Sequence, residues 1–151
     1  MPAQACEVRR ILTAILILNA MWFAAGFHLF WLRGRVFAKV VVPREHRESP
    51  VFETLIRSGT FVGGFNLAFC ILNILLVLNQ SSFDSGRQWA ILLAVNAIAH
   101  GTQFAGNVPI ALENRRGAGV WPVLSGLMLF IFIIDFTLMV LNAALGAGFM
   151  D

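Results

Sequence analysis

The fold class is most evident in the sequence Leu127-Met128-Leu129-Phe130-Ile131-Phe132-Ile133-Ile134-Asp135-Phe136. It lies within an apolar run from about residue 120 to residue 145, in which Asp135 is the only charged side chain. This run exceeds the length of about 20 residues that a helix needs to cross a bilayer. Because lipid cannot satisfy free backbone N–H and C=O groups, we expect the run to form a transmembrane helix.

Three further apolar runs are also long enough to cross a membrane, at about residues 11–32, 55–78 and 89–112. None alternates between polar and apolar residues as barrel strands do. Hydrophobic residues make up 58% of the chain and charged ones 13%, against about 45–50% and about 25% in soluble domains. The sequence therefore predicts an all-α integral membrane protein, with residues 1–151 forming a single membrane domain. The expected architecture is an antiparallel bundle of four transmembrane helices, because two of the three connections are short.

The long connection, residues 33–54, is polar and holds Pro43 and Pro50, so a continuous helix through it is not expected. Within it, residues 36–42 are predicted either to lie along the membrane surface or to pair as a short strand. The net charge of +3 does not indicate a nucleic-acid partner, because the basic residues sit between apolar runs.

The basic residues indicate the orientation of the chain. The side that holds the connection at 33–54 carries eight of them: Arg33, Arg35, Lys39, Arg44, Arg47, Arg57, Arg115 and Arg116. The other side carries only Arg9, Arg10 and Arg87. The positive-inside rule then places residues 33–54 in the cytoplasm and both termini outside, in a plasma or inner membrane. Arg9 and Arg10 before an apolar run also resemble a signal sequence, which would favour the opposite orientation.

Polar residues within the predicted spans indicate the candidate site, because ionisable groups in lipid face protein or water and mark function. Asp135 is the only acid in any span, and it must be neutral or ionised against a strong partner. On 89–112, the spacing of Asn96, His100, Gln103 and Asn107 puts all four on one helical face. Counting at about 1.5 Å per residue places Asn19, Asn73, Asn96 and Asp135 at similar depth, with Asn66 and His100 somewhat deeper and Gln103 further toward the cytoplasm. The candidate ligand-binding or proton-sensitive residues are Asp135, His100, Asn96, Gln103, Asn66, Asn73 and Asn19.

Three functions fit this pattern. The leading hypothesis is binding or transport of a small or lipid-like molecule, with Asp135 and His100 as a proton-sensitive pair. The second is an accessory subunit of a larger membrane complex, which would dock through small residues such as Gly59 and Gly63. The third is a membrane enzyme that uses Asp135 or His100 as a general acid or base on a lipophilic substrate.

For the asparagines, simple hydrogen bonding between helices is the alternative to a ligand site. Trp22 is expected to pack in the core or against a hydrophobic ligand. The sequence identifies no cofactor and no metal site, although His28 or His100 could each supply one axial haem ligand. The expected partners are membrane lipids, together with further copies of the chain or a larger membrane complex.

Overall fold

The computed structural model describes residues 2–150, and these residues form helices and loops with no strand among them. The four long helices are α1 (Pro2–Phe27), α3 (Pro50–Leu78), α4 (Gly86–Asn114) and α5 (Gly126–Gly148). The short elements are the π-helical turn η1 (His28–Leu32), the helix α2 (Gly34–Val41) and the 3₁₀ turns η2 (Arg44–His46) and η3 (Gln80–Ser82). The all-α prediction is confirmed.

Three helical segments are long and apolar enough to cross a membrane. They are Cys6–Leu32, Pro50–Leu78 and Gly126–Gly148, with mean hydropathies of 1.7, 2.3 and 2.3. Helix α4 has the same 29-residue length as α3 but is not among them. The polar residues along α4, including Asn96, His100 and Gln103, lower its hydropathy, although several of them are buried inside the protein.

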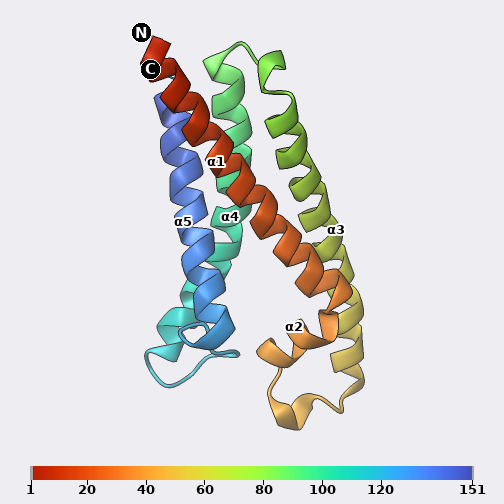
Figure 1. Ribbon diagram of the computed structural model, residues 1–151. Coiled ribbons are helices and arrows are strands. Elements are labelled where there is room, and N and C mark those ends of the chain that lie inside the picture. Colours follow the sequence, from red (N-terminus) through yellow and green to blue (C-terminus); the bar gives the residue numbers. More distant parts are fainter. Residues whose placement is uncertain (1, 151) are drawn as a thin grey trace.

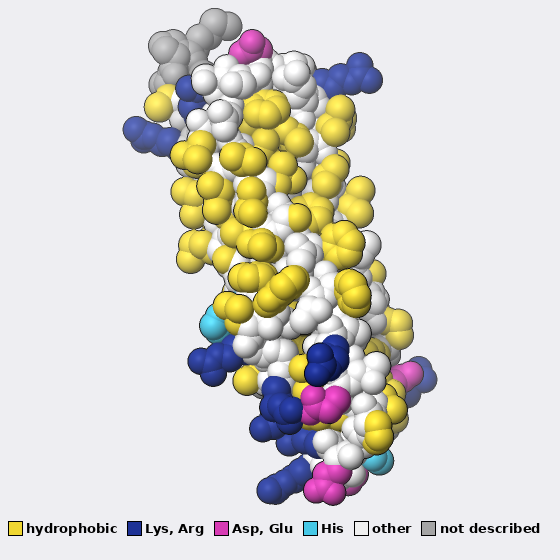
Figure 2. Space-filling model, turned by 90° about the vertical axis from the view of Figure 1, so that its right-hand side faces the viewer, with side chains coloured by type: hydrophobic (Ala, Val, Ile, Leu, Met, Phe, Trp, Pro, Cys, Tyr) yellow, Lys and Arg dark blue, Asp and Glu magenta, His cyan; other side chains and the backbone are white. Residues whose placement is uncertain are grey.

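The surface of the molecule is apolar over most of its length. Figure 2 shows hydrophobic side chains covering the middle of one face, with most of the charged side chains gathered at one end. Large apolar residues such as Phe61, Phe65 and Ile98 are 64–75% exposed. In a soluble monomer, so large an exposed apolar surface would be unusual. Together with the three apolar helices, it indicates a membrane location.

Several helices extend beyond the predicted limits, because an apolar run measures the span and not the helix. Helix α1 starts at Pro2 instead of near Ile11, since Pro is accepted in the first helical turn and the residues that follow favour helix. Helix α3 starts at Pro50 instead of near Leu55, because Ser49 caps it by accepting a hydrogen bond from the backbone of Val51.

The last helix begins later than predicted, at Gly126 instead of near residue 120. The preceding segment contains Pro122, and Ser125 is extended with φ −148° and ψ 158°. The amide of Asn114 holds this segment against α4 by donating to the carbonyls of Ala118 and Trp121. These contacts replace the first helical turns that the apolar pattern implied.

The strand alternative for residues 36–42 is wrong, because residues 34–41 form helix α2. Its small residues Gly34 and Ala38 are buried four positions apart, and Gly34 lies against Ile56 of α3. The helix stops at Val42, whose φ of −104° and ψ of 121° are extended. This is the conformation that the following Pro43 favours.

The long helices are arranged as two pairs, with both termini at the same end (Figure 1). Helix α1 packs along α3 and α4 packs along α5, whereas α1 contacts α5 over a shorter stretch. At the end near the termini a core cluster fills the interior with Leu12, Ile15, Leu16, Leu76, Trp89 and Leu93. Toward the opposite end the two pairs diverge around a cavity, so close packing between the pairs is confined to the half near the termini.

Candidate functional site

The interior of the molecule holds a cluster of polar side chains contributed by all four long helices. Seven polar residues are buried: Asn19, Asn66, Asn73, Asn96, His100, Asp135 and Asn142. Only Asn66 has a measurable exposed fraction, at 6%, and the other six are at 0%. Polar groups in such a position must find hydrogen-bond partners within the protein, because neither lipid nor bulk water reaches them.

The carboxyl group of Asp135 forms hydrogen bonds with two ring side chains, those of Trp22 and His100. Its Oδ1 lies 3.2 Å from Nδ1 of His100 and accepts a hydrogen bond from the indole Nε1 of Trp22 at 2.8 Å. Phe23 stacks on the His100 ring with a centroid distance of 4.7 Å, which holds the imidazole in place. The side chains of His100 and Asp135 are 0% and 1% exposed. A charge left unpaired at this depth would be very costly, so the two groups must act as a unit.

A chain of amides continues from His100 toward the end that carries the termini. The His100 Nε2 atom lies 3.2 Å from Oδ1 of Asn19, and Asn19 exchanges two hydrogen bonds of 2.9 Å with Asn142. The Asn19 amide also donates to Asn73 Oδ1 at 3.3 Å, and Asn73 donates to Asn96 Oδ1 at 2.9 Å. The network therefore links α1, α3, α4 and α5 through one central residue, Asn19.

The orientation of these amides follows from the backbone. The Nδ2 groups of Asn73, Asn96 and Asn142 each donate to the carbonyl four residues earlier, which identifies nitrogen and oxygen in each side chain. The Oδ1 atoms of Asn73 and Asn142 must then accept from Asn19, so the Asn19 Oδ1 atom is the one that faces His100. Because that oxygen can only accept, His100 Nε2 carries a proton.

The Nδ1 side of His100 accounts for one further proton. A hydrogen bond between Nδ1 and Asp135 Oδ1 requires a proton on one of these two atoms. With that proton on either atom, the pair is neutral overall. Without it, the carboxylate would face the nitrogen lone pair. A second added proton would leave an uncompensated charge on side chains that are almost fully buried. The geometry thus supports a neutral pair that shares one proton.

The second carboxylate oxygen, Asp135 Oδ2, is buried and has no hydrogen-bond partner among the described residues. Nearly all buried polar atoms in folded proteins have a partner, so an exception calls for a physical explanation. In either neutral form of the pair this oxygen is an acceptor, because the shared proton lies between Oδ1 and Nδ1.

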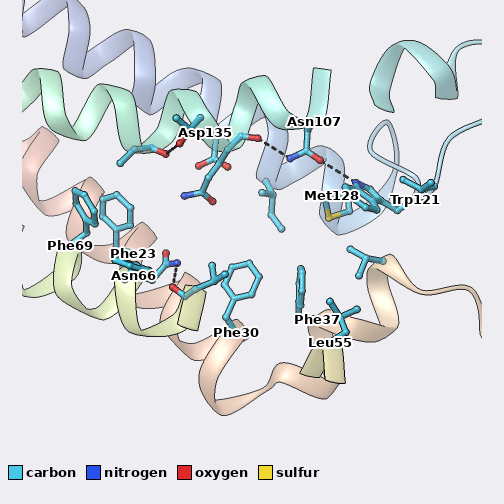
Figure 3. A pocket seen from close by; sticks show the side chains of 18 of the residues that line it. Phe23, Phe30, Phe37, Leu55, Asn66, Phe69, Asn107, Trp121, Met128 and Asp135 are labelled. Atoms are coloured by element: carbon cyan, nitrogen blue, oxygen red, sulfur yellow. Dashed lines mark hydrogen bonds between the residues drawn. The ribbon is translucent and has the colours of Figure 1, made fainter. Parts of the chain in front are cut away.

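Asp135 also forms part of the wall of a cavity of about 710 Å³ between the two helix pairs. In Figure 3, Phe23 and Phe69 lie near Asp135 at one end of the cavity, and Phe37, Leu55, Met128 and Trp121 lie at the other. Most of the lining residues are apolar, and none of the described ones is Lys or Arg. Ligand pockets in proteins typically enclose about 300–1,000 Å³ with a few polar groups in an apolar wall, and this cavity has those features.

The structure brings five of the seven predicted site residues into one network: Asp135, His100, Asn19, Asn73 and Asn96. The other two, Asn66 and Gln103, lie outside that network and line the cavity instead. Asn66 donates to its own helix at Val62, and its Oδ1 lies so close to Gly26 that a Cβ there would be 2.1 Å away. Asp135 forms no hydrogen bond with an amide side chain and is joined to the amide residues only through His100.

Two members of the network were not among the predicted site residues. Trp22, expected to pack in the core or against a ligand, donates a hydrogen bond to Asp135, and Asn142 pairs with Asn19. Helical spacing signals both, because Trp22 follows Asn19 by three residues and Asn142 follows Asp135 by seven. A tryptophan in an apolar segment does not reveal from sequence alone that its N–H meets a carboxylate.

His28 and His100, the two histidines considered as haem ligands, lie in different surroundings. Both ring nitrogens of His100 are engaged in hydrogen bonds, and His28 is exposed near the far end of the α1–η1 segment. Within residues 2–150, no group of three or more His, Cys, Asp and Glu side chains is placed to hold a metal ion. The arrangement can accept a hydrogen bond at Asp135 and move a proton between Asp135 and His100.

Comparisons of the chain with protein-family models, with curated proteins and with solved structures find no match.

Proposed function

We propose that this protein binds a lipid-like molecule within the membrane, in the cavity that ends at Asp135. The observation that carries the proposal is the unpartnered, buried Oδ2 of Asp135, a residue that lines a cavity whose wall is mainly apolar. An apolar wall favours a ligand that partitions into lipid, and a single acceptor would orient it. Transport of such a ligand would further require the protein to open at its closely packed end, near the termini.

The proposed architecture is a four-span antiparallel bundle in which α4 crosses the membrane with α1, α3 and α5. The polar residues that lower the hydropathy of α4 are compatible with a membrane span. Asn96 and His100 form hydrogen bonds inside the protein, so neither exposes an unpaired polar group to lipid. Following the distribution of Lys and Arg, we propose that α2 and the rest of the connection at residues 33–54 lie on the cytoplasmic side of a plasma or inner membrane. Both termini then lie outside.

The cavity has a neighbour that supports access from the bilayer. A second cavity of about 310 Å³ shares Phe30, Asn66, Gln103 and Ile131 with the first. Its wall runs between α1 and α5 and includes Phe130, which is 55% exposed on the lipid-facing surface of the proposed bundle. A lipid-like molecule could therefore pass between α1 and α5 without first entering water.

Filling the main cavity is expected to abolish specific binding. Ala99 lines this cavity from α4, and Ala99→Phe places a ring there. With the protein in phosphatidylcholine nanodiscs, 12-bromododecan-1-ol is expected to quench tryptophan fluorescence in a saturable way. Because the ring occupies the apolar volume, we expect Ala99→Phe to weaken the saturable part at least tenfold.

The matched control is Ala94→Phe, an exposed position on the same helix that does not line the cavity. It is expected to bind like wild type. If wild type shows no saturable quenching, or if both variants lose it equally, the proposed function is wrong. Thermal unfolding of both variants shows whether each remains folded.

Narrowing the opening between α1 and α5 is expected to slow binding. Ala25 lines the second cavity, whereas its neighbour Ala24 lies beside Cys70 and Ile74 in a different cavity. In stopped-flow quenching with the same bromoalcohol, Ala25→Trp is expected to slow association severalfold and Ala24→Trp to leave it unchanged. Equal rates in wild type and both variants would show that the molecule does not pass between α1 and α5.

Acid/base catalysis on a lipophilic substrate is a second candidate function, favoured by the hydrogen bond between His100 and Asp135. The same cavity would hold the substrate, and turnover would distinguish an enzyme from a binding protein. The accessory-subunit hypothesis gains no such support, because Gly63 lies against Trp31 and Gly59 against the carbonyl of Phe30 within the chain. Assembly into a homo-oligomer or a larger complex remains part of the proposal, since one chain of four spans encloses little space.

A further inference from the structure

We infer that the ligand of the cavity is an uncharged lipophilic molecule carrying a hydroxyl group, which donates its hydrogen bond to Asp135 Oδ2. This inference rests on the proposed binding function and specifies the chemical class of the ligand. It follows from three properties of the site: which atoms are free, what charge the site carries, and what other groups line the cavity.

The free atom requires a donor. Asp135 Oδ1 already takes part in two hydrogen bonds, with Trp22 and His100, while Oδ2 has none among the described residues. In both neutral forms of the pair Oδ2 is an acceptor. A ligand that only accepts hydrogen bonds, such as an ether or a ketone, would leave this oxygen buried without a partner, which is unfavourable. The ligand must therefore bring its own N–H or O–H group.

The charge of the site selects against ions. Because the Asp135 and His100 pair shares one proton and is neutral, it offers no net negative charge to compensate an ammonium group. The described lining contains no Lys or Arg, so a carboxylate or phosphate at this depth would also lack a partner. Either ion would lose its hydration without gaining an oppositely charged partner in the cavity. The favoured donor is uncharged.

Three other polar side chains of the cavity wall donate to carbonyls of their own helices, and the half-buried Gln103 side chain also lines the cavity. Thr102 donates to the carbonyl of Ala99, the Asn66 amide to that of Val62, and the Asn107 amide to that of Gln103. Among the described residues, Asp135 Oδ2 is the one buried side-chain nitrogen or oxygen that has no hydrogen-bond partner. An alcohol or a phenol on an apolar body matches one acceptor in an apolar wall, and a polyhydroxylated molecule does not.

The test compares three probes that share one brominated twelve-carbon chain. They are 12-bromododecan-1-ol, its methyl ether and 12-bromododecan-1-amine in its protonated form, each titrated into wild-type protein in phosphatidylcholine nanodiscs. We expect the saturable quenching to be about tenfold tighter for the alcohol than for either of the others, the scale of one hydrogen bond to a buried acceptor. This wild-type series does not depend on any variant folding.

The variant Asp135→Asn supplies the second arm. Its amide can keep an oxygen toward Trp22 only by presenting NH₂ to the cavity, and NH₂ donates equally well to an alcohol and to an ether. We expect the preference for the alcohol to fall within twofold of unity in this variant. A preference that survives Asp135→Asn would overturn the assignment of Asp135 as the acceptor.

The outcomes separate this inference from the proposed function. Saturable binding of the alcohol and the ether with equal affinity would overturn the inference and leave the binding function intact. Tighter binding of the ammonium probe would show that the site carries net negative charge, and would also overturn it. The absence of saturable binding for all three probes would instead count against the proposed function itself.

Discussion

Replacing Asn19 by leucine is expected to lower the free energy of unfolding by about 2–3 kcal/mol. Asn19 takes part in four side-chain hydrogen bonds, with Asn73, His100 and, twice, Asn142. Such bonds in membrane proteins contribute about 0.6 kcal/mol each on average, with values up to about 1.7. The leucine also leaves buried donors and acceptors of its partners without a counterpart, which adds to the loss.

This expectation is checked by titrating the purified protein from mild detergent into sodium dodecyl sulfate and following helix loss by circular dichroism. The control is Asn79→Leu, because Asn79 is exposed and its side chain donates only to the carbonyl of Leu75, one turn earlier in α3. It is expected to change the unfolding free energy by less than about 0.5 kcal/mol. Equal effects of the two substitutions would mean that the buried network contributes no more than a surface amide.

The second large effect concerns Asp135 and His100 as a unit. Asp135→Leu is expected to destabilise the protein by about 3 kcal/mol, because it leaves the donors of Trp22 and His100 buried without the carboxylate. The double variant Asp135→Leu with His100→Phe removes both members and keeps an aromatic ring where Phe23 stacks. Its loss of unfolding free energy is expected to be smaller than the sum of the losses in the two single variants, by at least about 1 kcal/mol.

The same detergent titration, carried out on all four members of this mutant cycle, measures the coupling. Asp84→Leu with His28→Phe forms a matched control cycle, since both residues are exposed and no hydrogen bond or ion pair joins them. That cycle is expected to be additive within about 0.5 kcal/mol. Additivity in the Asp135 and His100 cycle would show that the two side chains are independent and that they do not share a proton.

The helical architecture was predictable because membrane-spanning length and hydropathy are local properties. The runs around residues 11–32, 55–78 and 120–145 each correspond to a helix that is long and apolar enough to cross a membrane. Helix ends were less predictable, since they depend on contacts that an apolar count does not register. Ser49 starts α3 by capping it, and Asn114 delays the start of α5 by holding the loop before it.

The membership of the site was partly predictable from helical spacing. Asn96 and His100 lie four residues apart, and the structure joins both to the same network. Gln103 continues the same spacing but faces the cavity, because the two helix pairs have diverged at its level. Trp22 was missed as a partner of Asp135, since the partner of its N–H depends on how α1 crosses α5.

The sequence by itself therefore determined that the chain is helical, that it is suited to a membrane, and that Asp135 is the one carboxylate placed deep in an apolar helix. The tertiary structure adds which groups Asp135 contacts and which of its carboxylate oxygens has no hydrogen-bond partner among the described residues. The physical reason is that hydropathy and helical period act along a single helix. Hydrogen bonds between helices instead depend on how those helices cross, which no single segment specifies.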